Sequence, residues 1–254
     1  MKFGGVLLIW VARALAFQGR QAGLEAATRL GTTKAPMIAN VKKVVAQMRQ
    51  LTQAPLSDDE LAWFARDRGG DPVAAVAKAE KYASWRRGGW GGLASDREGL
   101  KRLALAEAKK RVGYLAEPRD VLGRPVVTVV AKRHMAASRN IRSSQALCID
   151  VLESAIEKLG DDAEQFVAIV DLRHCGTRQV DIQFLIWLVT TLRSYYPKRL
   201  GQVALVDPPT VLFQAAWSLV TPYLGKHADL VRIVPSSEIK DFYFHHNQIP
   251  HDLR

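Results

Sequence analysis

Apolar residues in the first part of the chain recur at the spacing of an α-helix. From Met37 to Leu51 they fall on one stripe, with basic residues off it, which predicts an amphipathic helix. Ser57 and Glu60 have the spacing of a capping box, which marks the start of a helix. Asp71 followed by a proline opens another. The pattern therefore predicts a small helical bundle, with helices over residues 37–51, 57–69 and 71–90.

The pattern changes near residue 125, after a further helix predicted over residues 97–115. A β-branched run after Pro125 fits a buried strand, and from there strands alternate with helices. Such alternation predicts a largely parallel sheet with crossover helices. The predicted fold class is α/β: a helical N-terminal subdomain followed by this sheet. Strands are predicted over residues 125–131, 166–172, 202–206 and 230–234, and helices over residues 141–159, 181–196 and 209–224.

The helix predicted over residues 209–224 is apolar nearly all round. Phe213, Trp217 and Val220 are among its apolar side chains. The helix contains no charged residue, and the first one after it is Lys226. Such a helix must be covered by protein, by a ligand or by a membrane. The pattern alone leaves two interpretations open, a buried helix of an ordinary α/β core or a helix that covers a ligand.

The composition indicates a folded chain without disulfide or metal chemistry. Its 254 residues, of which 48% are hydrophobic, can bury a full core. Cys148 and Cys175 lie in separate elements without CxxC spacing, so neither a disulfide framework nor a zinc site is predicted. His245, His246 and His251 lack the i, i+4 spacing of a preorganised site, which favours an exposed tail. We therefore predict no metal and no cofactor.

The formal charge of +11 is concentrated near the N-terminus, where residues 1–53 hold eight basic residues and one acidic residue. Lys2 precedes a short apolar run, and a small-residue pattern follows, as in a secretory signal. Together with the basic stretch behind it, this segment resembles the two-part plastid signals of algae with complex plastids. We predict that residues 1–35 are a targeting leader, or alternatively a disordered basic terminus. Because the surplus charge lies there, nucleic-acid binding is not predicted.

Enzyme motifs typical of α/β folds are missing from the sequence. No GxGxxG follows a predicted strand, and neither GxxxxGK[ST] nor GxSxG occurs. His174 and Cys175 follow a predicted strand and could be drawn as a base with a nucleophile. Sequence neighbours at a strand end point in different directions, however, which favours a loop histidine beside a buried cysteine. The chain is therefore predicted not to be an enzyme, and a small α/β enzyme is kept as an alternative.

Several ordered blocks, spread over residues 41–253, resemble the CRAL-TRIO lipid-binding domain family, in particular its phosphatidylinositol-transfer-like members. They are Arg66, Arg68, Asp71, Trp85 and Arg86; then Asp120, Gly123, Arg124 and Pro125; then residues 169–172, 195–201 and 222–224. The resemblance implies a helical N-terminal subdomain and an α/β domain whose sheet floors a deep apolar pocket. It also implies that the helix over residues 209–224 is a movable gate. With the targeting or disordered leader over residues 1–35, the expected domains are residues 36–95 (helical subdomain) and 96–254 (lipid-binding domain).

The resemblance also suggests which residues contact a ligand. In phosphatidylinositol-transfer members the position of Lys198 is typically a glutamate, and a lysine stands where this chain has Leu230 or Val231. These departures argue against phosphatidylinositol, whereas another phospholipid or apolar molecule fits. Headgroup or membrane contacts are expected at Arg68, Lys198, Arg199 and Lys226. Pocket walls are expected at Val127, Val129, Ile169, Phe184, Leu188, Leu205, Phe213, Trp217 and Val220.

The function implied by the resemblance is binding of one hydrophobic molecule, and its transfer or presentation between membranes. The expected partners are this lipid and an anionic membrane surface. The chain is expected to be a monomer that is cytoplasmic or organellar and peripheral to a membrane. A lipid sensor or scaffold that does not transfer its ligand is the main alternative.

Overall fold

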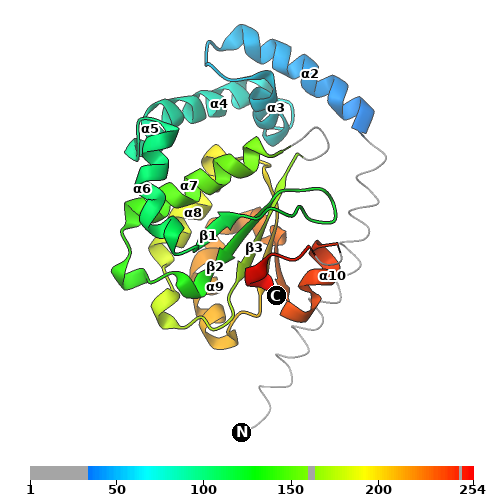
Figure 1. Ribbon diagram of the computed structural model, residues 1–254. Helices are drawn as coiled ribbons and strands as arrows, with labels where there is room; N and C mark the ends of the chain where they lie inside the picture. Colours follow the sequence, from blue (N-terminus) through cyan, green and yellow to red (C-terminus); the bar gives the residue numbers. More distant parts are fainter. Residues whose placement is uncertain (1–33, 160–163, 246–247) are drawn as a thin grey trace.

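The computed structural model describes residues 34–159, 164–245 and 248–254 (Figure 1). Its N-terminal part is the predicted bundle, and the predicted caps are in place. Ser57 Oγ accepts from Glu60 N at 3.1 Å, while the Glu60 carboxylate accepts from Ser57 N at 2.8 Å. Asp71 Oδ1 caps the third helix through two backbone amides. The helices are α2 (Lys34–Leu51), α3 (Asp58–Asp67) and α4 (Pro72–Arg87).

The fourth predicted helix is shorter than expected. The short turn α5 (Gly89–Gly92) leads into α6 (Arg97–Lys109), which ends before residue 115. At Arg111 the backbone has a positive φ of 53°, which reverses the chain, and residues 113–115 become strand β1 (Gly113–Leu115). The predicted helix 97–115 was therefore wrong at its end, because an edge strand follows the turn.

The predicted sheet is confirmed, with the strand order β1-β2-β3-β4-β5. Strand β1 is antiparallel to β2, and the other neighbours are parallel. Each crossover moves one strand further in the same direction, and right-handed connections of this kind place their helices on one face. The strands are β2 (Val126–Val130), β3 (Phe166–Asp171), β4 (Leu200–Val206) and β5 (Val231–Val234), and the crossover helices are α7 (Ile141–Glu157), α8 (Ile182–Tyr195) and α9 (Thr210–Leu224).

The other face of the sheet is covered by α10 (Ile239–Tyr243) and the C-terminal segment (Figure 1). Phe244 and Leu253 are buried in the cluster formed by this face. Asp252 accepts from Arg133 Nη2 at 2.6 Å and from Tyr114 OH at 2.8 Å, and the hydrogen bond from Arg133 lowers the pKa of Asp252 strongly. The predicted exposed tail is therefore corrected, since apolar burial and ion pairing hold this segment against the sheet. Individual side chains are nevertheless exposed at His245 and His251, and His246 lies outside the described residues.

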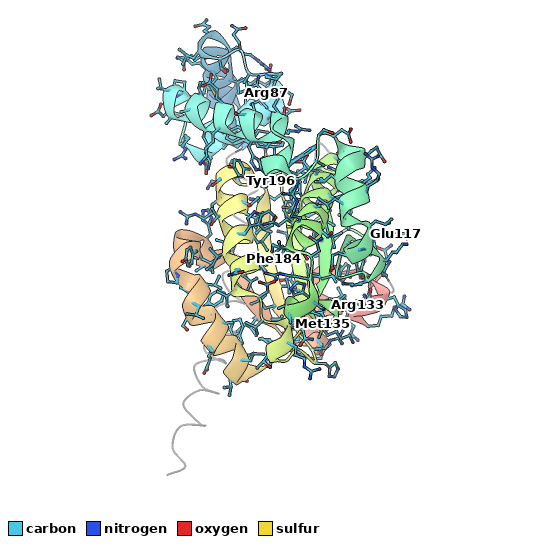
Figure 2. The ribbon with its side chains drawn as sticks, turned by 90° about the vertical axis from the view of Figure 1, so that its left-hand side faces the viewer. Arg87, Glu117, Arg133, Met135, Phe184 and Tyr196 are labelled. Atoms are coloured by element: carbon cyan, nitrogen blue, oxygen red, sulfur yellow. The ribbon has the colours of Figure 1, made fainter. Side chains whose placement is uncertain are left out.

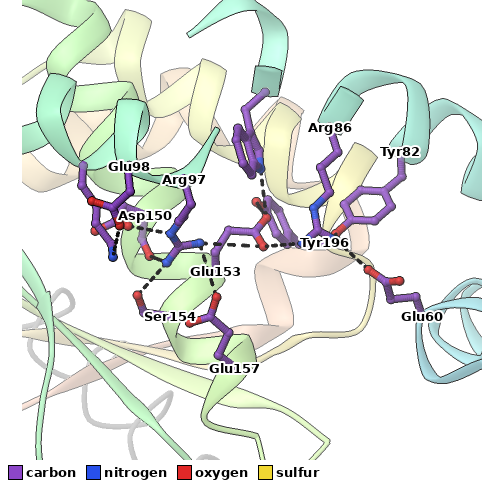
Figure 3. Close-up of polar contacts among 12 residues, drawn as sticks. Glu60, Tyr82, Arg86, Arg97, Glu98, Asp150, Glu153, Ser154, Glu157 and Tyr196 are labelled. Carbon is purple, nitrogen blue, oxygen red and sulfur yellow. Dashed lines mark hydrogen bonds and ion pairs between the residues drawn. The ribbon is translucent and has the colours of Figure 1, made fainter. Parts of the chain in front are cut away.

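A buried polar junction connects the bundle to the α/β part (Figure 3). Glu153 Oε1, on α7, accepts from Trp90 Nε1 at 3.1 Å and from Tyr196 OH at 2.7 Å. Its other oxygen lies 3.8 Å from Arg86 and 3.9 Å from Arg97. Four other segments thus meet at one buried carboxylate of α7, which holds the C-terminal end of α8 through Tyr196.

Candidate functional site

The two faces of the sheet differ in how tightly they are packed. On β3, Val167 and Ile169 are fully buried, whereas Ala168 and Val170 between and after them are only partly buried. Because successive side chains point to opposite faces, one face is filled by protein and the other borders open space. The partly filled face presents a register of small and medium apolar residues: Val127 and Val129, Ala168 and Val170, Val203 and Leu205, and Val231.

This face is the floor of a cavity of about 1190 Å³, walled by α7, α8 and α9. Ligand clefts for small molecules typically measure roughly 300–1,000 Å³, so the space suits a larger molecule. Helices α8 and α9 are highly apolar, yet among their described side chains only Thr191 on α8 and Val220 on α9 are buried. Figure 2 looks onto this helical layer, with the sheet behind it. The apolar side chains of α8 and α9 are partly exposed because they face the cavity.

Helix α9 is apolar on its inner and its outer side. Phe213 and Trp217 line the cavity, and their rings stack with centroids 5.5 Å apart. On the side away from the cavity, Val211 is 82% exposed, Leu219 56% and Tyr223 42%. Exposed apolar side chains gathered on one helix are unusual for a surface that meets only water. Its two sides therefore offer one contact surface to the cavity and another to the outside.

Eight of the nine predicted wall residues line the cavity: Val127, Val129, Phe184, Leu188, Leu205, Phe213, Trp217 and Val220. The prediction for Ile169 is corrected. Its Cα is paired with Thr128 and Ala204, and all three side chains are fully buried on the opposite face of the sheet. Because both faces of β3 carry apolar residues, the sequence does not show which of its side chains point toward the cavity.

One end of the cavity, at the amino ends of β3 and β4, is basic. Arg68, Lys78, Arg193 and Lys198 line it. Lys78 Nζ binds Asp67 Oδ2 at 2.7 Å, and burial lowers the pKa of this lysine. Arg193 Nη1 donates to the carbonyl of residue 223 at 2.6 Å, which ties α8 to the last turn of α9. Arg68 and Lys198, both predicted from the sequence, therefore lie beside the cavity.

The predicted role of Arg199 is corrected. Its guanidinium lies 3.6 Å from the centre of the Trp63 ring and donates to the carbonyl of Glu164 at 2.7 Å. Only 7% of the residue is exposed, and burial together with the neighbouring Arg66 lowers its pKa. Arg199 joins α3 to the sheet and does not line the cavity. The side chain of Lys226 lies outside the described part of the chain.

The opposite end of the cavity, at the carboxyl ends of β2 and β3, holds a polar network that the sequence did not reveal. His134 Nε2 lies 3.1 Å from Asp181 Oδ2, and Arg139 Nη2 donates to Asp181 Oδ1 at 3.0 Å. His134 and Asp181 line the cavity. The only sequence signal was the position of Asp181 just before an apolar helix, where it acts as the cap of α8.

Both cysteines line the cavity and neither is activated as a nucleophile. Burial raises the pKa of Cys148 to about 12 and that of Cys175 to about 11. Thiolate is the nucleophilic form, so these thiols are inert near neutral pH. His174 is exposed, with a positive φ of 61°, and does not line the cavity. Within the ranges that the structure covers, no three His, Cys, Asp or Glu side chains are grouped to hold a metal ion, and no helix has the length and apolar character needed to cross a membrane.

Comparisons with known proteins point in one direction. A model of the CRAL/TRIO domain family matches residues 109–253. The chain is 28% identical over 91 residues to "Protein real-time" of Drosophila pseudoobscura pseudoobscura, an alignment that covers 32% of this chain and 14% of that protein. It is 29% identical over 92 residues to a CRAL-TRIO domain-containing protein of Caenorhabditis elegans, covering 34% of this chain and 13% of the relative. The matched segment is thus a small part of both relatives.

Among solved structures, the crystal structure of Sfh5 has a similar fold. Its TM-score is 0.59 at 15% sequence identity, and the match covers 73% of this chain and 67% of that one. This likeness concerns the fold alone. It supports the order of elements described above, with a helical N-terminal part before a mostly parallel sheet.

Proposed function

The chain belongs to the CRAL/TRIO domain family, and we propose that it encloses one hydrophobic molecule in the cavity and transfers it between membranes. Members of this family bind hydrophobic ligands. The observation that carries the proposal is the cavity of about 1190 Å³ between the apolar face of the sheet and α7, α8 and α9. Filling this space with an apolar molecule is favourable, because it removes apolar surface of the cavity and of the molecule from water. Each square ångström removed contributes roughly 25 cal/mol.

Within this proposal, the eight wall residues that line the cavity contact the ligand, and α9 is the gate. Trp217 and Phe213 face the ligand when α9 covers the cavity, whereas Val211 and Leu219 face outward. An outward apolar side lets α9 contact the hydrocarbon of a bilayer while its inner side still covers the ligand. Opening then exchanges one apolar environment for another, so the two states differ little in free energy.

The basic end of the cavity is proposed to face the polar part of a phospholipid or an anionic membrane surface. Besides the effect of burial, Arg68 and Arg193 both lie close enough to Lys78 to lower its pKa, and Lys198 lines the same cavity. Basic side chains near an anionic leaflet contribute about 1 kcal/mol each. The chain is proposed to act at membrane surfaces as a monomer without nucleic acid as a partner.

The test separates ligand retention from membrane contact with two substitutions on α9. Trp217→Asp places a carboxylate against the cavity, whereas Val211→Asp places the same group on the outer side. Lipid that copurifies with each protein is quantified by mass spectrometry. Transfer is then measured between phosphatidylcholine vesicles with and without phosphatidylserine. We expect Trp217→Asp to lose copurified lipid, and Val211→Asp to keep it but transfer it more slowly.

Other outcomes decide among the alternatives. A wild-type protein that holds lipid but moves none between vesicles would support the sensor or scaffold function. A wild-type protein without lipid that turns over a soluble substrate would support an enzyme and refute the proposal. If Trp217→Asp keeps as much lipid as Val211→Asp and the wild type, Trp217 does not contact the ligand.

A further inference from the structure

The polar end of the cavity, at the carboxyl ends of β2 and β3, has a feature that carrying an apolar molecule does not require. Its lining includes His134, Cys175, Gln179 and Asp181. Gln179 is already engaged, since its Oε1 accepts from Gly176 N at 2.9 Å and its Nε2 lies 3.3 Å from the sulfur of Met135. Cys175 is held in its protonated, weakly polar form. His134 and Asp181 therefore decide what this end can bind.

Asp181 has no hydrogen-bonding capacity left for a ligand. Its Oδ1 accepts from Phe184 N at 3.1 Å and from Arg139 Nη2 at 3.0 Å. Its Oδ2 pairs with Arg139 Nε and lies 3.1 Å from His134 Nε2. A carboxylate offers about four acceptor sites, and four donors are arranged around this one. Asp181 thus serves to orient its neighbours.

The contact with Asp181 determines which ring nitrogen of His134 carries the hydrogen. Because an ionised carboxylate only accepts, His134 Nε2 carries the hydrogen and donates it to Asp181. Arg139 also pairs with the Asp181 carboxylate, so the charge of Asp181 already has a partner. In a neutral ring the other nitrogen, Nδ1, is an acceptor, and among the described residues the structure gives His134 a side-chain hydrogen bond through Nε2 only. The ring also packs near Phe184, with centroids 6.0 Å apart, at the end of an apolar cavity.

A second polar group lies at the same end. Ser144 is in the first turn of α7, which begins beside the carboxyl end of β2 because α7 is the crossover that follows this strand. The residue lines the cavity, and its Oγ is buried without a hydrogen-bond partner in the described part of the chain. A buried hydroxyl without a partner is unfavourable. A ligand hydroxyl can donate to His134 Nδ1, and Ser144 Oγ is a second polar atom that a ligand can satisfy.

We infer that this end of the cavity, called the His134 site from here on, binds a hydroxyl group at one end of an elongated apolar ligand. The inference rests on the proposed function and narrows its ligand class. The six residues of β3 rise about 3.3 Å each, so the basic end and the His134 site lie roughly 17 Å apart. A lipid that buried only methyl ends would leave His134 Nδ1 unpaired. A long-chain or polycyclic alcohol pairs it.

The experiment offers the purified full chain a mixture of hexadecanol and its methyl ether, delivered from methyl-β-cyclodextrin. The ether keeps the acceptor oxygen and the chain but lacks the hydrogen that His134 Nδ1 would accept. Bound alcohol and ether are quantified by mass spectrometry after gel filtration. We expect the wild type to prefer the alcohol by about tenfold, which corresponds to 1.4 kcal/mol. His134→Phe should bring the ratio close to one.

The control is His251→Phe, the same substitution at an exposed histidine that does not line the cavity, and it should keep the wild-type ratio. Equal binding of alcohol and ether by the wild type overturns the inference whether or not His134→Phe folds, while the proposed function stands. An unchanged preference in His134→Phe overturns it as well. A wild type that binds neither probe and copurifies with no lipid refutes the proposed function too.

Discussion

Replacement of two alanines in the centre of the sheet by phenylalanine tests whether the cavity exists. Ala168 on β3 and Ala204 on β4 are near neighbours of the same size on adjacent strands, but they point to opposite faces. Ala168 borders the cavity, whereas Ala204 is fully buried in the cluster under α10. Replacing each by phenylalanine adds the same ring to two different environments.

The expected effects follow from the space that each ring meets. At Ala204 the ring must displace close-packed neighbours, and overpacking of this kind costs roughly 1–3 kcal/mol. For a chain of this size 1 kcal/mol shifts the melting temperature by about 2–4 °C, so Ala204→Phe should lower it by roughly 2–12 °C. At Ala168 the ring enters a cavity of about 1190 Å³, and the melting temperature should stay nearly unchanged. The same ring takes space from the ligand, so Ala168→Phe should lose copurified lipid.

The assay needs delipidated protein for the melting curves, because a ligand at a hundredfold excess over its Kd adds about 2.7 kcal/mol to stability by itself. Lipid content is measured separately, on protein as purified. If Ala168→Phe destabilises the fold as much as Ala204→Phe, the space over β3 is filled by protein and the reasoning fails. Full retention of lipid in Ala168→Phe would place the ligand elsewhere.

Three further predictions concern other parts of the molecule. Lys198→Glu combined with Val231→Lys should increase binding to phosphoinositide vesicles in a flotation assay, and no increase would show that these positions do not determine headgroup choice. Glu153→Gln should lower stability by about 1–3 kcal/mol in urea unfolding, since it weakens a buried charged hydrogen-bond junction, whereas Glu157→Gln, 68% exposed, should change it by less than about 0.5 kcal/mol. Cys175, with its pKa raised to about 11, should react with iodoacetamide about 100-fold more slowly than free cysteine near pH 7.5 and faster as the pH rises toward 11; fast reaction at neutral pH would contradict its burial.

The elements of the fold follow from local signals, and their boundaries are sharp where a cap defines them. Ser57 with Glu60 and Asp71 with its proline place two helix starts to the residue, because each cap satisfies amides that would otherwise lack a partner. The end of α6 had no such marker. Lys110 and Arg111 continue the basic sequence past Lys109, and the helix ends there because the chain reverses at Arg111 and β1 pairs with β2.

The walls of the cavity were predictable as apolar elements, whereas the direction of each side chain was not. Ile169 and Val170 are adjacent β-branched residues on a strand with both faces apolar, so the sequence does not show which of the two points into the cavity. The His134 site could not be predicted from the sequence for another reason. His134 and Asp181 are 47 residues apart, and only the neighbouring carboxyl ends of β2 and β3 bring them together. Arg199 was misjudged because a basic residue beside an aromatic helix end also suits a cation–π contact with a distant tryptophan.

The distribution of packing explains how α9 could move without loss of the fold. The described residues form three hydrophobic clusters: one in the bundle, one around α6, α7 and the sheet, and one under α10. None of the three includes a residue of α9, although α9 is the most apolar helix with defined side chains. It is held by contacts with α8 and by the hydrogen bond from Arg193 to the carbonyl of residue 223. Segments with few core contacts open at a lower free energy than the whole molecule, so the proposed gate can open while all three clusters stay intact.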